Sequence, residues 1–242
     1  MINSKEVKRI VFKVGTSSLT YDTGKINIRR MSALARVLSA LKNAGKEIVL
    51  VTSGAIGVGV GKLGLGERPH DTPGRQAAAT VGQLLVTRDD FEDDERRRNL
   101  HNTFMKLFEY GAIPVVNEND SVAVEEIVFG DNDSLSAHVA KLVEADALVI
   151  LTDIDGLFSA NPREDESARL ISSVDRITDE ILALAGGSGT SRGTGGMITK
   201  LHAGEIATSA GIDTVVMNGS DPEDIYKLLD GRQIGTHFKA QR

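Results

Sequence analysis

Residues 9–14 read RIVFKV and lead directly into Gly15-Thr16-Ser17-Ser18. The run is short, almost continuously apolar and rich in β-branched side chains, which is typical of a strand covered on both faces. Four later runs share this character and lie at residues 47–52 (EIVLVT), 112–117 (AIPVVN), 147–152 (ALVILT) and 214–217 (TVVM). Strands of this kind occur in parallel sheets whose two faces are packed against helices.

The segments between these runs have helical patterns. Apolar residues recur at helical spacing over residues 28–44, and the pattern stops at Gly45, a residue suited to the end of a helix. Residues 135–144, 177–185 and 198–210 also predict helices, and the charged residues 89–98 predict an exposed one. Strands alternating with helices predict an α/β fold with a mainly parallel central sheet and helices on both faces, a three-layer sandwich.

The composition narrows the function classes. A chain of 242 residues suits one large α/β domain or two small ones, and the absence of cysteine excludes disulfides, thiolate catalysis and Cys-based zinc sites. A net charge of −6 and an aromatic content of 4% argue against a nucleic-acid partner. The charged first residues and the lack of a long apolar stretch predict neither a signal peptide nor a membrane span, so we expect a cytoplasmic protein.

Polar residues follow the predicted strands where each strand ends. Gly15, Thr16 and Ser17 follow the first strand, and Ser53 and Gly54 follow the second. Asn117 ends the third run and Asp120 comes soon after it, while Thr152 ends the fourth run and Asp153 follows it directly. Because the carboxyl ends of parallel strands meet at one edge of a sheet, where ligands collect, this distribution predicts a site there.

A glycine-rich stretch, Arg192-Gly193-Thr194-Gly195-Gly196-Met197-Ile198-Thr199-Lys200, precedes the last predicted helix. Backbone N–H groups at a helix start favour an anion, and Lys200 adds an ammonium group, so the stretch predicts a phosphate cradle. It does not have the spacing of the usual P-loop. A flexible linker is the alternative interpretation.

Lys13 lies within an apolar strand, where an ammonium group is unfavourable unless it meets an anion. The alternative is an edge-strand lysine that extends to water. Ser53 allows two similar interpretations, because it could cap a helix or, together with Gly54, contact a ligand.

The acidic stretch Gly130-Asp131-Asn132-Asp133-Ser134 lacks the ligand spacing and closing glutamate of a calcium loop. Asp131 could cap a helix, while the acids and the carboxamide could bind a substrate ammonium group and hold lysines in place. None of the five histidines falls at the spacing of a catalytic pair.

Two lysines and glycine-rich cradles without an evident base indicate a particular chemistry. An alcohol that accepts a phosphoryl group needs a base, whereas a carboxylate with a pKa of about 4.3 is already ionised at neutral pH. Transfer to a carboxylate needs alignment and cations that absorb charge, and this chain offers both.

Several motifs, in chain order, resemble those of the glutamate 5-kinase family within the amino-acid kinase superfamily. They are KVGTSSL, VTSGAIGVG, RQAAATVGQ, LVTRDDFEDDERR, IPVVNENDSV, FGDNDSLSA, LTDIDGLFSANPR and GTGGMITKLHA. The resemblance covers nearly the whole chain, and the NEND, GDND and GTGGM-x-TK segments are specific to that family among its superfamily relatives.

The resemblance implies roles for individual residues. Lys13 and Lys200 would act on the transferring phosphoryl group, with Asp133 orienting both. The residues implied to bind glutamate are Ser53, Gly54, Asn117, Asp120 and Asn132. Those implied to bind the nucleotide are Lys13, Gly15, Thr16, Ser17, Thr152, Asp153, Thr194, Gly195, Gly196, Met197, Ile198, Thr199 and Lys200.

The implied reaction converts ATP and L-glutamate to ADP and L-glutamate 5-phosphate, with Mg²⁺ held mainly by phosphates and water. The resemblance further implies proline as feedback inhibitor, glutamate-5-phosphate reductase as the next pathway enzyme and a homo-oligomer. The alternatives are a sister kinase acting on acetylglutamate, carbamate or UMP, or a catalytically weak sensor of proline or glutamate.

The chain departs from the family pattern in two places. Many members carry a C-terminal PUA domain, whereas here residues 1–242 are expected to form a single kinase domain, with glutamate bound by residues 1–145 and nucleotide by residues 146–242. In addition, Gln83 runs straight into Leu84, so roughly twenty residues are absent, enough for a helix of several turns. A helix ending at Gly82 would have to enter a strand almost at once; the sequence leaves open whether the protein is shorter here or a segment is missing from it.

Overall fold

The five predicted strands lie in one eight-stranded sheet together with three further strands. The computed structural model describes residues 2, 6–21, 23, 26–52, 80–119, 131–185 and 196–241. The strands are β1 (Arg9–Val14), β2 (Glu47–Thr52), β3 (Thr80–Val86), β4 (Ala112–Glu118), β5 (Ala147–Thr152), β6 (Ser173–Val174), β7 (Asp213–Asn218) and β8 (Thr236–Phe238). The helices are α1 (Thr16–Leu19), α2 (Ile28–Asn43), α4 (Asp89–Glu92), α5 (Asp94–Glu109), α6 (Asn132–Leu142), α7 (Asp179–Ala185), α8 (Met197–Ser209) and α9 (Asp224–Leu229).

The sheet is mainly parallel, as predicted. Its strand order is β3-β4-β2-β1-β5-β7-β8-β6, and β8 pairs antiparallel with β7. The four strands predicted to end in site residues, β4, β2, β1 and β5, are neighbours at its centre and run in one direction. Their carboxyl ends therefore meet at one edge, which we call the carboxyl edge; the opposite edge is the amino edge.

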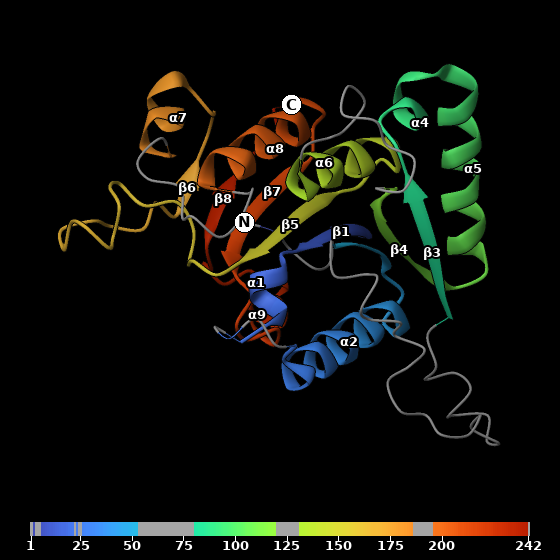
Figure 1. Cartoon of the computed structure of the whole chain (residues 1–242), viewed down its shortest axis with the longest axis horizontal. Coiled ribbons are helices and arrows are strands. Elements are labelled where there is room, and N and C mark those ends of the chain that lie inside the picture. Colours follow the sequence, from blue (N-terminus) through green and yellow to red (C-terminus); the bar gives the residue numbers. More distant parts are fainter. Residues whose placement is uncertain are drawn as a thin grey trace.

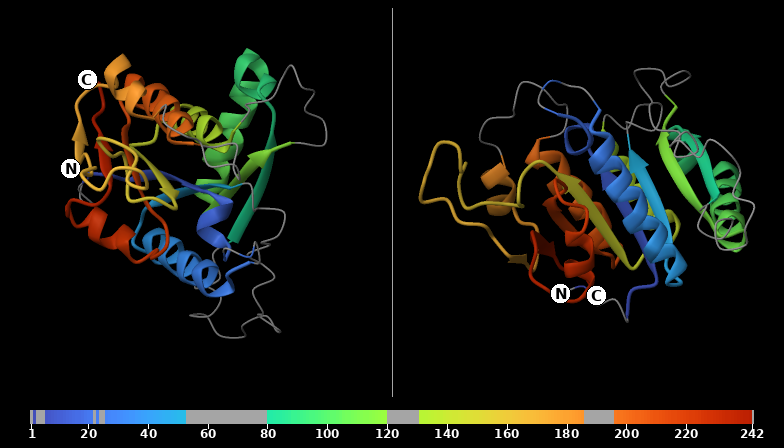
Figure 2. Two further views of the ribbon diagram at one scale, coloured as in Figure 1. Left: turned by 60° about the vertical axis from the view of Figure 1, so that its left-hand side comes forward. Right: turned by 90° about the horizontal axis from the view of Figure 1, so that it is seen from below.

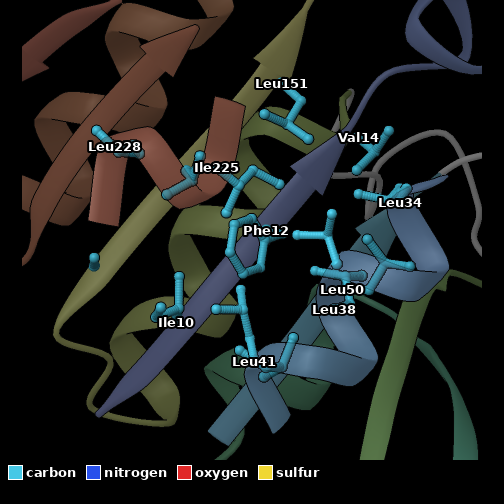
Figure 3. Close-up of a cluster of buried hydrophobic side chains, with 14 of the residues drawn as sticks. Ile10, Phe12, Val14, Leu34, Leu38, Leu41, Leu50, Leu151, Ile225 and Leu228 are labelled. Atoms are coloured by element: carbon cyan, nitrogen blue, oxygen red, sulfur yellow. The ribbon is translucent and has the colours of Figure 1, made fainter. Parts of the chain in front are cut away.

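Helices cover both faces of the sheet and form the predicted three-layer sandwich (Figures 1 and 2). One apolar cluster lies between β1 and the helices α2 and α9, where Phe12 contacts side chains from both sides (Figure 3). A second cluster on the opposite face joins the sheet to α5, α6 and α8. Successive residues of a strand point to opposite faces, so Ile10, Phe12 and Val14 enter the first cluster and Val11 enters the second.

The helix predictions are confirmed with shifted ends, apart from one break. The helix predicted from residue 28 ends at Asn43, just before Gly45. The charged segment predicted as one helix forms two, because Asp93 has extended backbone angles (φ −76°, ψ 127°) and accepts a hydrogen bond from the Arg96 N–H as the N-cap of α5. The acidic cap therefore separates α4 from α5.

Strand β3 corrects the expectation for the shortened region. Residues 80–86 are one continuous strand that pairs with β4 from Thr80 to Val86, so Gly82 does not end a helix. A side-chain carbon added at Gly82 would lie 2.7 Å from Leu107 Cδ2 of α5. The absence of a side chain at Gly82 therefore lets α5 pack close to β3, the edge strand of the sheet. Gln83 and Leu84, where the shortening was expected, are consecutive residues within this strand.

Candidate active site

Strand alternation directs Lys13 toward the face covered by α6 and α8. Val11, two residues earlier on β1, packs in the cluster on that face. Lys13 is only 8% exposed on this inner strand, so the alternative of an edge lysine extending to water is wrong. Its ammonium nitrogen lies 2.6 Å from Asp133 Oδ1.

Asp133 lies in the first turn of α6 and is 1% exposed. The helix begins at Asn132, and Asp131 is its N-cap, accepting hydrogen bonds from the backbone N–H and the hydroxyl of Ser134. The capping interpretation of Asp131 is thus confirmed. Because α6 leads into β5 at the amino edge, its first turn lies at the carboxyl edge, beside the end of β1.

Lys200 reaches the same carboxylate from α8. It lies in the first turn of that helix, is 4% exposed, and its Nζ is 3.1 Å from Asp133 Oδ2. The hydroxyl of Thr199 lies 2.8 Å from Asp133 Oδ2 as well as 2.8 Å from the carbonyl oxygen of Gly196. We call Lys13, Asp133 and Lys200 the lysine cluster.

The charges of the lysine cluster do not balance. Burial raises the pKa of Asp133, but the ammonium groups of Lys13 and Lys200 and hydrogen bonds from Lys13 and Thr199 outweigh this and hold the pKa below its ordinary value. The carboxylate is therefore ionised, and two ammonium groups share it. Within these three residues the positive charges outnumber the negative charges by one, an arrangement that favours binding of an anion.

Two further features at the carboxyl edge suit a phosphate. Gly196 is the N-cap of α8 and contributes no side-chain hydrogen bond, so the first N–H groups of this helix are not capped by their N-cap residue. A side-chain carbon added at Gly15 would lie 3.7 Å from Lys13 Nζ and 3.6 Å from Ser17 Oγ. Gly15 and Ser17 thus lie beside the Lys13 ammonium, and Thr16 and Ser17 are exposed.

Residues predicted for the two substrates occupy separate strand ends. At the end of β5, the buried Thr152 donates a hydrogen bond from its hydroxyl to the exposed Asp153 carboxylate (3.1 Å). At the end of β4, the Asn132 amide donates to the side-chain oxygen of Asn117 (3.1 Å), which joins α6 to the sheet.

The structure describes most, but not all, of the predicted residues. Met197 and Ile198 lie in the first turn of α8, as the motif predicts. Two details were missed: Thr199 contacts Asp133, and Glu118 is buried at the end of β4, inside the NEND segment that could have indicated it. Ser53, Gly54, Asp120, Thr194 and Gly195 lie outside the described residues.

A sequence model of the amino acid kinase family matches residues 8–88 and 74–218. The chain belongs to the amino acid kinase family. Among curated members of this family, the glutamate 5-kinase of Clostridium perfringens is 48% identical over 98% of this chain and 97% of the relative. The glutamate 5-kinase of Listeria monocytogenes is 47% identical over 98% of this chain and 95% of the relative. The protein from Carboxydothermus hydrogenoformans with the same name is 48% identical, but the chain covers 69% of its length.

Solved structures of amino acid kinase relatives share the fold. A carbamate kinase from Giardia lamblia bound to AMP-PNP superposes with a TM-score of 0.64 at 17% identity, covering 97% of this chain and 99% of that one. A UMP kinase from Bacillus anthracis gives a TM-score of 0.62 at 14% identity, covering 98% and 97%.

The comparisons also bear on the shortened region of this amino acid kinase. The alignment with the Clostridium perfringens enzyme has 262 positions, whereas 98% of 242 residues is about 237, so about 25 positions have no residue here. The two matches of the family model share residues 74–88, a stretch that contains the expected shortening at Gln83 and Leu84.

Among the described helices, none is long and apolar enough to cross a membrane.

Proposed function

We propose that this chain transfers the γ-phosphoryl group of ATP to the γ-carboxylate of L-glutamate, forming L-glutamate 5-phosphate in the first step of proline biosynthesis. The observation that carries the proposal is the lysine cluster, in which two buried ammonium groups share one carboxylate at the carboxyl edge. The excess positive charge suits a transferring phosphoryl group. The identity of about 48% with glutamate 5-kinases over nearly the whole chain supports glutamate as the acceptor.

The lysines supply the catalysis in this proposal. Negative charge on the phosphoryl oxygens is stabilised by Lys13 and Lys200, which Asp133 holds in place. Asp133 itself does not accept a proton, because its pKa is lowered and both of its oxygens contact ammonium groups. The glutamate γ-carboxylate needs no base, since it is ionised at neutral pH.

The remaining predicted residues bind the substrates. In the proposal, Gly15, Thr16, Ser17 and the start of α8 contact the ATP phosphates, and Thr152 and Asp153 contact the nucleoside. Asn117 and Asn132 hold glutamate together with Ser53, Gly54 and Asp120, and Thr194 and Gly195 complete the nucleotide loop. Residues 1–145 then bind mainly glutamate and residues 146–242 mainly nucleotide.

The donor set near the lysine cluster fits a magnesium ion that enters with the nucleotide. Both Asp133 oxygens contact ammonium groups, and the described residues contain no group of three or more histidine or acidic side chains placed to hold a metal. Phosphate oxygens and water are the ligands that Mg²⁺ commonly uses in kinases. Bound there, the ion would neutralise phosphate charge.

The wider context of the proposal follows from the same relatives. A chain that makes glutamate 5-phosphate would supply glutamate-5-phosphate reductase, and proline, the end product, would act as feedback inhibitor. We place the protein in the cytoplasm as a homo-oligomer. Inhibition by added proline and sedimentation of the purified protein test the inhibitor and the oligomeric state.

The test of the reaction is ADP release with L-glutamate, compared with aspartate, acetylglutamate, carbamate and UMP. We expect release only with glutamate, and hydroxylamine should trap the product as a hydroxamate, because amines attack an acyl phosphate readily and a phosphate ester poorly. Apart from effects on folding or binding, activity should not fall on the acid side until the pH approaches the acceptor's own pKa of about 4.3. Glutamate-dependent ADP release without a hydroxamate would contradict a carboxylate acceptor, and nucleotide binding without turnover would favour a sensor.

A further inference from the structure

The chain leaves β5 at Thr152 and makes an excursion before it reaches β6. The base of this excursion is a short antiparallel pairing, in which the Ile171 N–H donates to the Leu157 carbonyl (2.8 Å) and the Ser159 N–H donates to the Arg169 carbonyl (2.9 Å). The residues between Thr152 and Leu157 include Asp153, which the proposed function assigns to the nucleoside. What fixes Leu157 therefore matters for the nucleotide.

Thr236 of β8 joins the two sides of this base. Its hydroxyl accepts a hydrogen bond from the Leu157 N–H (2.8 Å) and donates one to the Ile171 carbonyl (2.6 Å). Thr236 and Leu157 are 0% and 1% exposed, so water does not replace these bonds readily. One side chain thus satisfies a donor on one arm of the excursion and an acceptor on the other.

The backbone passes so close to Thr236 that only glycine fits beside it. Gly156 has a φ of +150°, and a side-chain carbon there would lie 2.6 Å from Thr236 Oγ1. The other end of the segment is held by β7, because the Gly219 N–H donates to the Thr152 carbonyl (2.8 Å) and the Asn218 amide donates to Asp155 Oδ1 (2.8 Å). The segment 153–156 is thereby held from both sides, by hydrogen bonds from Asn218 and Gly219 at the end of β7 and by Thr236 of β8.

We propose that Thr236 is a positioning residue for nucleotide binding, which acts by holding the segment that carries Asp153 at the carboxyl edge. The inference rests on the proposed function for the assignment of Thr152 and Asp153 to the nucleoside. Thr236 touches neither substrate in this scheme. Its hydroxyl sets where the chain can go after β5, and so where the Asp153 carboxylate lies.

Thr236→Val tests the proposal, and Thr214→Val is its matched control. Both threonines are 0% exposed on neighbouring strands of the sheet, and valine has the same shape as threonine. The Thr214 hydroxyl has no hydrogen-bond partner within the described part of the chain, whereas that of Thr236 has two. Loss of the Thr236 hydroxyl leaves the buried Leu157 N–H and the Ile171 carbonyl without this hydrogen-bond partner, whereas loss of the Thr214 hydroxyl removes no hydrogen bond within the described part of the chain.

The readouts are the Kd for ATP by calorimetry without glutamate, and the KM values for ATP and glutamate. Thr236→Val should raise the Kd and KM for ATP about ten-fold and leave the KM for glutamate within about two-fold. Thr214→Val should leave all three constants unchanged, and Thr236→Ser, which keeps the hydroxyl, should restore most of the ATP affinity. Circular dichroism at the assay temperature verifies that each variant is folded.

Two results would overturn the proposal. One is ATP binding by Thr236→Val that is as tight as in the parent protein; the other is an equal weakening of ATP and glutamate binding, as a general loss of stability would cause. Failure of the proposed function is distinguishable, because a parent protein that binds ATP but does not turn over glutamate leaves the calorimetric comparison of the two valine variants intact.

Discussion

Strand β1 runs between two clusters of charged side chains that differ in their balance. At its start, Arg9 belongs to an amino-edge cluster with Lys8, Glu47 and Asp146. At its end, Lys13 belongs to the lysine cluster. Three residues of one buried strand therefore separate a set with two basic and two acidic members from a set with two basic members and one acidic member.

The amino-edge cluster satisfies its members within the protein. The Arg9 guanidinium contacts Glu47 through Nε and Nη2, both at 2.7 Å, donates to the Val143 carbonyl, and lies 5.0 Å from the centre of the Phe108 ring. Asp146 accepts the backbone N–H groups of Lys8 and Arg9 at 2.7 Å. These ion pairs and backbone hydrogen bonds join β1 to β2 and to the end of α6.

The lysine cluster is more deeply buried, and its three residues carry two positive charges and one negative charge. Keeping a second ammonium group buried on one carboxylate is unfavourable for the folded protein alone, and an incoming anion removes that penalty. The comparison indicates that balance of charge, rather than the number of ion pairs, distinguishes a structural cluster from a binding site.

Among the variants that test this comparison, Asp133→Asn should cause the largest loss of unfolding free energy. Removal of the shared carboxylate leaves two buried ammonium groups together, and the loss of one partner of a buried ion pair typically costs about 3–5 kcal/mol of unfolding free energy. Urea unfolding at pH 7 measures this loss. Because the pKa of Asp133 is below its ordinary 3.8, the contribution is present above that value and is lost only as the pH falls through the lowered pKa, so the difference between parent and variant should stay constant from pH 7 to about pH 4.

Asp131→Asn is the control for that experiment, because asparagine caps a helix about as well as aspartate and Asp131 contacts neither lysine. Its unfolding free energy should stay within roughly a few tenths of a kcal/mol of the parent value, because the preferred N-cap residues differ little in the stability that they give to a helix. Equal losses in the two variants would mean that the Asp133 ion pairs contribute nothing specific.

Lys200→Met should have the next largest effect, and on turnover rather than stability. The methionine keeps the buried apolar stem, while loss of the ammonium group removes charge stabilisation of the transition state, which typically costs about 10²–10³ in rate. We expect kcat to fall far more than the KM for glutamate rises. Lys141→Met, at an exposed position in the last turn of α6, is the matched control, and unchanged turnover in Lys200→Met would remove Lys200 from the mechanism.

Arg9→Met should do the reverse, with turnover retained and stability reduced. Among the described residues Glu47 then keeps only the exposed Lys8 as a charged partner. Loss of a hydrogen bond between charged groups costs about 1.5–3 kcal/mol, reduced by the partial exposure of this pair. Burial raises the pKa of Glu47, but Arg9 and Lys8 outweigh burial and lower it below 4.5, so the contribution is present above pH 4.5 and is lost in more acidic solution. Denaturant unfolding at pH 7 and pH 3.5 measures the stability, and ADP release measures the turnover. A loss of kcat as large as that of Lys200→Met would contradict the distinction between the two clusters.

His138→Gln should have the smallest effect and sharpens the acid-side measurements. Burial lowers the pKa of His138 on α6, Lys141 and Arg88 lower it further, and Glu92 opposes them. The unfolded chain therefore binds a proton before the folded protein does, so the parent protein should lose a little stability as the pH falls below 6.5. In the variant the unfolding free energy should be flatter between pH 7 and pH 5; an identical slope would mean that His138 does not titrate differently on folding.

The sequence alone predicted the sheet centre and the residues around it. Residues 9–14, 47–52 and 147–152 were predicted as strands with the bounds that the structure has, because each is almost continuously apolar, as is typical of a strand covered on both faces. The family resemblance implied that Asp133 orients Lys13 and Lys200, and the structure joins the three residues because parallel topology places a strand end and two helix starts at one edge.

Tertiary structure decided what depends on contacts between distant segments. Residues 80–86 have no strong strand pattern of their own and become β3 by pairing with β4 while Gly82 admits α5. Folding places the Thr236 hydroxyl between Leu157 and Ile171, and it brings the Thr199 hydroxyl, in the first turn of α8, to Asp133; no sequence pattern marks either contact. Local periodicity encodes which faces are buried, but a hydrogen bond across 65 or more positions of sequence depends on packing that no local pattern contains.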